Sequence, residues 1–166
     1  GAAISNYLRW GRRMAHYVAE FIRTYFPGCE ESYVTATAGS LGLRRTRWLD
    51  AETTLTREHY ERGPKYEDAV GRGVVMTPRP MHPTERTFDI PRACLLPKVV
   101  GGLIVGSGRG ASCDPAELLR VMPVTMAVGQ GAGVVAAVAA RAAASPRDAE
   151  IQEVQRELVR QGVRLN

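Results

Sequence analysis

The chain has 166 residues, of which 45% are apolar and 23% charged, and a net charge of +5 at neutral pH. These proportions match globular proteins and exclude a disordered or fibrous chain, while the length suits one domain better than an enzyme that holds both a dinucleotide and a substrate. The arginines are dispersed along the chain and form no dense basic block, which argues against nucleic-acid binding.

The cysteines and the N-terminus bear on the cellular compartment. Cys29, Cys94 and Cys113 have neither paired metal-ligand spacing nor the density of a disulfide scaffold. The first residues lack the apolar core and cleavage site of a secretory signal. We therefore expect reduced thiols, no metal site and a cytoplasmic protein.

One uncharged segment, residues 121–140, has the length of a membrane span. It contains Pro123, Gln130 and three glycines, and is otherwise rich in alanine. A buried helix and no membrane contact are the prediction.

The N-terminal segment predicts a long helix. Its apolar residues recur at steps of three and four, Ser5 can cap its start, and Pro27 with Gly28 can end it. We expect the resulting stripe to face a core. It consists of Ile4, Tyr7, Leu8, Met14, Val18, Phe21, Ile22 and Tyr25.

The next segments predict short strands and a loop. Residues 33–37 alternate and are rich in β-branched side chains, and residues 44–49 can form a second strand of an antiparallel ribbon. Residues 62–83 are rich in glycine, proline and charge, with no helical period beyond one turn near residues 66–70. We expect an irregular loop there, of the kind that is commonly functional or interfacial.

The C-terminal half predicts strands followed by helices. Residues 88–90 and 102–105 are brief apolar runs that suit strands, and the second run is followed by a glycine turn at residues 106–110. A long helix follows Pro123. A last helix follows the capping sequence that starts at Ser145. This helix ends at Gly162.

The glycine turn and the helix after it are the segments that suggest chemistry. Glycines after a buried strand let the backbone approach a ligand, and their amides can face a phosphate. Gly129, Gly131 and Gly133 permit close packing of the helix against a flat ligand or against another backbone. Composition alone leaves both interpretations open.

Three longer sequence segments resemble those of a known protein family. Residues 104–112 read IVGSGRGAS, residues 119–133 read LRVMPVTMAVGQGAG, and residues 41–47 read LGLRRTR. The first two resemble the C-terminal flavin-contacting region of the FAD-dependent oxidoreductase family, and residues 41–47 resemble the Gly-x-Arg-x-x-Arg segment that lies upstream in that family. The resemblance continues in order to the tail at residues 151–163. It implies an α/β fold, the C-terminal portion of a two-domain, Rossmann-like FAD-binding flavoprotein with part of a substrate domain.

The resemblance also implies a domain organisation and a partner. Residues 1–95 would belong to the substrate-binding domain, residues 96–145 to the C-terminal segment of the FAD-binding domain, and residues 146–166 to a final helix and tail. The Gly-x-Gly-x-x-Gly dinucleotide fingerprint is absent from the sequence. We therefore expect the chain to supply half of an FAD site and to act with an N-terminal FAD-binding polypeptide, either a separate subunit or a cleaved half, and with a small-molecule substrate.

The resemblance assigns candidate cofactor-binding residues at the glycine turn and at the start of the long helix. A helix N-terminus there can stabilise the negative charge that reduction leaves at the N1 and C2 carbonyl edge of the flavin. The candidates are Gly106, Ser107, Gly108, Arg109, Arg120, Met122, Pro123, Val124 and Thr125.

Three further residues are candidates for substrate chemistry. Arg44 and Arg47 match an arginine pair of the family and can bind an anionic substrate group or a cofactor phosphate, although a structural salt bridge is an equal alternative. His82 matches a histidine in a substrate-side loop and can act as general base or bind substrate, against the alternative of a surface histidine.

The sequence departs from the family near the expected pocket. Ala93 stands where the family has an arginine, Glu117 and Leu118 stand where it has a Gly-Ser pair, and the acid that precedes His82 is missing. We expect hydride transfer between an organic substrate and flavin N5. The alternatives are a non-catalytic interaction subunit with a flavoprotein-like fold, and a basic nucleic-acid-binding domain.

Overall fold

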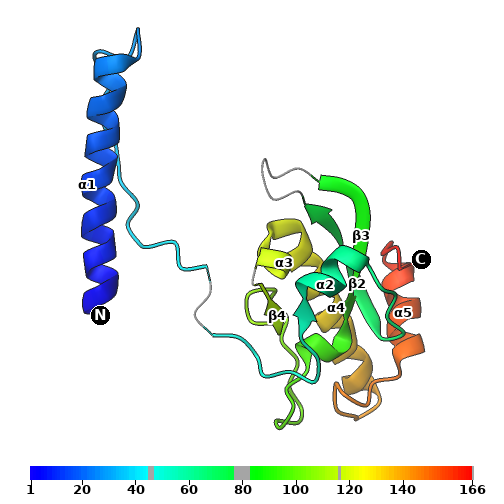
Figure 1. The fold of residues 1–166 in the computed structure, drawn as a ribbon. Coiled ribbons are helices and arrows are strands. Elements are labelled where there is room, and N and C mark those ends of the chain that lie inside the picture. The colour runs from blue at the N-terminus through cyan, green and yellow to red at the C-terminus, as the bar shows by residue number, and fades with distance from the viewer. Residues whose placement is uncertain (45–46, 77–82, 116, 166) are drawn as a thin grey trace. The chain divides into compact units, whose positions relative to one another are not determined.

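The computed structural model describes residues 1–44, 47–76, 83–115 and 117–165, and it divides into two compact units, residues 1–43 and 44–166 (Figure 1). The first unit holds helix α1 (Ala2–Tyr25), whose last turn is closed by the amide of Phe26 donating to the carbonyl of Ile22. The helix is confirmed, although it begins after Gly1 and not at a Ser5 cap. No residue of α1 is buried, so the expected core contact of its apolar stripe is wrong for this chain.

The second unit is built on a β-hairpin. Strand β2 (Ala69–Met76) pairs antiparallel with β3 (Pro83–Pro91), and β1 (Leu55–Thr56) pairs in parallel with β4 (Cys113–Asp114). Residues 88–90 lie in β3, which confirms that predicted strand.

The irregular loop expected at residues 62–83 is wrong for residues 69–76, which form β2, and residues 77–82 lie outside the described residues. Gly71 and Gly73 interrupt the apolar pattern of this strand, so the sequence did not indicate it. Gly73 has no side chain because a Cβ atom there would overlap the ring of Phe88, and Gly71 faces the backbone of Ala127. Strand interiors use glycine where another group approaches this closely.

The expected ribbon of residues 33–37 and 44–49 is also wrong. No described residue of either segment lies in a strand, and the same is true of residues 102–105. The latter run in extended form, and the amide of Val105 donates to the carbonyl of Leu95 at 2.9 Å. A β-branched composition favours extended chain, but a strand also needs a neighbouring strand as partner.

Helices complete the second unit. They are α2 (Arg57–Arg62), α3 (Glu117–Arg120), α4 (Met122–Arg141) and α5 (Ile151–Arg160), with a 3-10 turn at Arg92–Leu95. The long helix after Pro123 and the last helix are confirmed. The cap of α5 is Glu150 and not Ser145, and Gly162 follows the helix with φ +88°, the left-handed backbone that glycine adopts readily.

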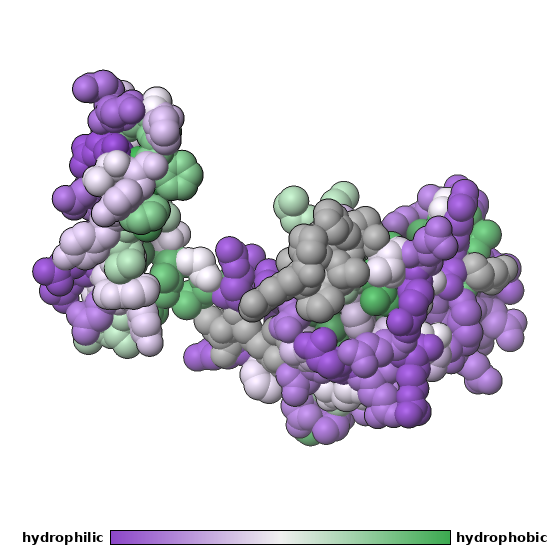
Figure 2. All heavy atoms as spheres, turned by 45° about the horizontal axis from the view of Figure 1, so that its top comes forward, coloured by the Kyte–Doolittle hydropathy of each residue, from purple (hydrophilic) through white to green (hydrophobic). Residues whose placement is uncertain are grey.

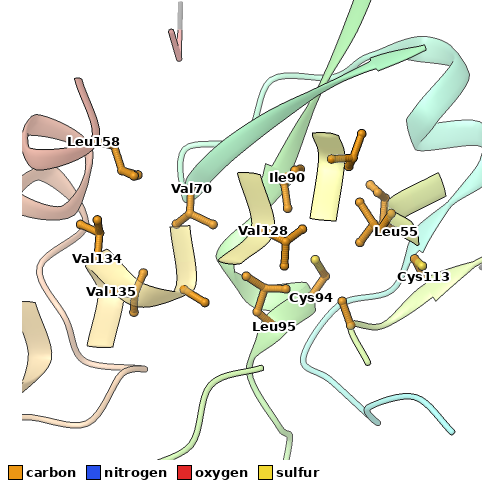
Figure 3. Close-up of a cluster of buried hydrophobic side chains, with 14 of the residues drawn as sticks. Leu55, Val70, Ile90, Cys94, Leu95, Cys113, Val128, Val134, Val135 and Leu158 are labelled. Atoms are coloured by element: carbon orange, nitrogen blue, oxygen red, sulfur yellow. The ribbon is translucent and has the colours of Figure 1, made fainter. Parts of the chain in front are cut away.

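One core joins these elements. Val128 and Val135 of α4 pack among Val70 of β2, Ile90 of β3 and Leu158 of α5 (Figure 3). In the described part of the chain, α4 is the one helix long and apolar enough to cross a membrane, a test that the core helix of a soluble protein also passes. Its buried residues show that it packs as a core helix of this unit, as expected.

The mixture of helices and strands confirms the α/β class. The division after Leu43 follows compactness alone. The boundaries expected at residues 95 and 145 stay a prediction.

Candidate functional site

The glycine turn at residues 106–110 is closed by Ser107. The carbonyl of Ser107 accepts hydrogen bonds from the amides of Gly110 (3.0 Å) and Ala111 (2.9 Å), and its hydroxyl accepts one from the amide of Arg109 (3.3 Å). Two amides of the turn and that of the next residue are therefore used locally and do not face a ligand. Ser107 and Arg109 are exposed.

Gly108 is buried where the turn meets the junction of α3 and α4. A Cβ atom on Gly108 would overlap the carbonyl oxygen of Leu119 and lie 2.8 Å from Oγ1 of Thr125. The Thr125 hydroxyl itself donates to the Leu119 carbonyl at 2.8 Å. The absence of a side chain at Gly108 thus serves contact between two parts of the protein.

The start of the turn lies close to the middle of α4. A Cβ atom on Gly106 would lie 3.7 Å from Cβ of Ala132, and one on Gly129 would lie 3.5 Å from the carbonyl oxygen of Gly106. Small residues in the middle of α4 therefore let the turn lie close to the helix. The sequence suggested this arrangement as one of its two interpretations of the glycines.

The start of α4 is positive and partly apolar. Val121 is the N-cap, proline follows in the first turn, and the first turn has no acidic residue. The first amides of a helix have no partner within it and carry partial positive charge. Met122 and Met126 are 81% and 74% exposed, so an apolar surface adjoins this positive end. Val124 is buried in the core and cannot touch a ligand without a rearrangement.

Three arginines belong to backbone segments that adjoin this junction. The amide of Leu49 donates to the carbonyl of Gly110 at 2.8 Å, which brings the segment of Arg47 to the glycine turn. Arg109 precedes Gly110, and Arg120 follows Leu119. Within the described part of the chain, none of these three arginines forms a salt bridge. Arg44 is exposed near the start of the same unit, and His82 lies outside the described residues.

The positions that depart from the family have structural partners. The amide of Ala93 donates to Oδ2 of Asp68 at 2.9 Å, and Glu117 lies 3.4 Å from Arg57 in a half-exposed ion pair. An exposed pair of this kind adds little stability. Neither residue occupies the junction of the glycine turn with α4.

The buried carboxylate of Asp89 was not predicted from the sequence. Asp89 in β3 is buried, with Oδ1 3.1 Å from Nε of Arg72 in β2 and Oδ2 accepting from the amide of Tyr66 at 3.3 Å. Burial first, and then the nearby Cys94, Asp68 and Asp89, raise the pKa of the Tyr66 phenol. No sequence motif marks this group. Its contacts join β2, β3 and the segment before β2, which is a structural role.

The thiols differ in accessibility. Cys94 and Cys113 are buried, whereas Cys29 is half-buried. Burial, followed by the neighbouring Cys113, raises the pKa of the Cys94 thiol far above its ordinary range. In the folded protein we expect Cys29 alone to react quickly with an aromatic disulfide reagent, and all three thiols to react in denaturant. Release of the coloured thiolate measures both, and rapid native labelling of Cys94 would contradict the described core.

Fold and site together define an α/β protein with a basic, partly apolar surface where a glycine turn meets a helix start, an arrangement suited to an anionic cofactor. The sequence model of the FAD dependent oxidoreductase family matches residues 4–158. The chain belongs to this family. No curated protein and no solved structure matches the chain.

Family membership implies oxidoreductase activity with FAD as the cofactor. The residues present fit part of such a cofactor. The start of α4 lacks acids, and the arginines beside it can face negative charge. The assignment of individual cofactor-binding residues stays a prediction.

Proposed function

We propose that this chain is a subunit or segment of an FAD-dependent oxidoreductase that transfers a hydride between an organic substrate and N5 of the flavin. It would act in the cytoplasm, together with a polypeptide that carries the Gly-x-Gly-x-x-Gly fingerprint. The observation that carries the proposal is the glycine turn seated on the start of α4, within the span that the family model matches. When bound, FAD supplies the hydride acceptor or donor.

Each side of the junction has a proposed task. The N-terminus of α4 would stabilise negative charge on the flavin ring, because its amides are fixed before reaction and need no rearrangement. Arg109, Arg120 and Arg47 would bind the anionic groups of cofactor or substrate, since guanidinium forks pair well with phosphate and carboxylate. Met122 and Met126 would exclude water beside the ring.

The remaining predicted residues complete this proposal. Gly106 and Ser107 would lie along the cofactor chain, and Arg44 would support substrate binding. His82 would accept or donate a proton at the substrate, as its ordinary pKa lies near working pH.

The visible spectrum of the complex between this chain and the fingerprint-bearing polypeptide tests the proposal. We expect the absorption bands of oxidised flavin, and FAD in the supernatant after denaturation. Arg109→Gln should weaken FAD retention about tenfold, because a charge-assisted hydrogen bond contributes about 1.5 kcal/mol or more.

Arg86→Gln is the matched control. Arg86 is an exposed arginine on β3, and its loss should change FAD retention less than twofold. A complex that forms but binds no flavin would overturn the proposal in favour of a non-catalytic interaction subunit.

A further inference from the structure

The junction between α3 and α4 contains a carbonyl group that has lost its ordinary helical partner. In an unbroken helix the carbonyl of Leu119 would accept a hydrogen bond from the amide of the residue four positions further along the chain. That residue is Pro123, which has no amide hydrogen. The helix is accordingly interrupted here, since α3 ends at Arg120 and α4 begins at Met122.

The hydroxyl of Thr125 replaces the missing amide. It donates to the carbonyl of Leu119 at 2.8 Å, and Leu119 is 0% exposed, so water does not reach this carbonyl. Gly108 lies against the same oxygen atom, which a Cβ atom at Gly108 would overlap. A buried carbonyl without a donor is costly, so the hydroxyl of Thr125 stabilises the interruption between the two helices.

The interruption leaves a free amide at the start of α4. The amide of Thr125 donates to the carbonyl of Val121 at 2.9 Å, which is the first bond of the helix. The amide of Met122 precedes this bond and has no partner within the helix. Met122 is exposed, on a unit whose surface in Figure 2 is mostly hydrophilic, so a ligand can reach this end of α4.

We propose that Thr125 is a positioning residue that keeps the Met122 amide free for the cofactor. Its hydroxyl occupies the carbonyl of Leu119, which would otherwise take the amide of Met122 three residues further along, as in a 3-10 turn. That bond would cancel positive charge at the end of α4 where the proposed function places the flavin ring. The inference rests on the proposed function, and it gives Thr125 a role that needs no contact with the cofactor.

Hydrogen exchange at single amides of the full chain, measured by NMR without cofactor, tests this role. Thr125→Val removes the hydroxyl at nearly constant shape, whereas Thr125→Ser keeps the hydroxyl. In Thr125→Val we expect the Met122 amide to exchange about tenfold more slowly, because a hydrogen bond to the Leu119 carbonyl now protects it. In Thr125→Ser its exchange should stay within about twofold of the unsubstituted chain.

Pro123→Ala provides a second control. It restores a backbone donor for the Leu119 carbonyl, so the hydroxyl of Thr125 becomes redundant. In this background Thr125→Val should change the exchange of the Met122 amide by less than about twofold. The proposal is overturned by unchanged or faster exchange in Thr125→Val, by slower exchange in Thr125→Ser, or by equal slowing with and without Pro123→Ala.

The flavin-containing complex shows whether the free amide serves the reaction. Thr125→Val should weaken the binding of reduced flavin about fivefold more than that of oxidised flavin, because only reduction adds negative charge near the helix start. The reduction potential of the flavin measures this ratio, and Thr125→Ser should leave it unchanged. An unchanged potential in Thr125→Val overturns the role of this amide toward the cofactor. A complex without flavin overturns the proposed function, while the exchange of the Met122 amide still decides what Thr125 does at the junction.

Discussion

Gly108→Ala is expected to lower the free energy of unfolding of residues 44–166 by about 3 kcal/mol and to remove flavin from the complex. The new methyl group would overlap the Leu119 carbonyl oxygen and press on Oγ1 of Thr125 at 2.8 Å. The first neighbour is backbone and cannot rotate away. Relief requires the glycine turn to move off the start of α4, which disrupts the candidate site. Urea unfolding, with the slope of the transition unchanged, measures the loss.

Gly106→Ala is the matched control for this change. Its new methyl group would meet Cβ of Ala132 at 3.7 Å, an ordinary contact, so we expect a stability change within about 0.5 kcal/mol. Equal effects of the two substitutions would contradict the packing described for Gly108. Loss of flavin from Gly108→Ala without loss of stability would instead indicate direct contact between Gly108 and the cofactor.

The helices could be predicted because their periodicity is a local property. The apolar spacing of α1 and α5 and the proline at the start of α4 each suffice without knowledge of the rest of the fold. The caps were less predictable, since Gly1 and Glu150 hold positions that Ser5 and Ser145 were expected to hold. Several polar residues near a helix start can serve as the cap.

The strands depended on neighbours that the sequence does not reveal. β2 was missed because Gly71 and Gly73 interrupt its apolar pattern, and the reason for both glycines lies in Phe88 and Ala127, far along the chain. Residues 33–37 have strand composition, but they pair with no strand among the residues that the structure describes. The strand propensity of a residue reflects how well its side chain packs against neighbouring strands more than it reflects a preference of the backbone.

The candidate site was predictable in its parts and not in its assembly. The glycine turn and the start of α4 stand out in the sequence. The approach of Arg47 to them depends on a hydrogen bond from Leu49 to Gly110, residues that no motif connects. Gly108 shows the limit most clearly, because a glycine that suits a ligand and a glycine that suits a carbonyl oxygen look the same in sequence.

Gly131→Ala is expected to destabilise residues 44–166 by about 2 kcal/mol, although alanine is the better helix former by about 1 kcal/mol. Gly131 is the point where α4 crosses β2. A Cβ atom there would overlap the carbonyl oxygen of Val70 and lie 3.1 Å from Cβ and Cγ2 of the same residue. Helix and strand would have to separate, and the core residues Val128 and Val135 on either side of the crossing would lose packing.

Gly133→Ala makes the same chemical change two residues further along α4, where a Cβ atom would meet nothing within 4 Å. We expect this variant to gain up to about 1 kcal/mol, since only the helix propensity changes. The two substitutions should therefore move the urea midpoint in opposite directions. A stabilised Gly131→Ala would mean that α4 does not cross β2 in this register. Without that crossing, α4 could not hold its N-terminus beside the glycine turn, and the candidate site would lose its physical basis.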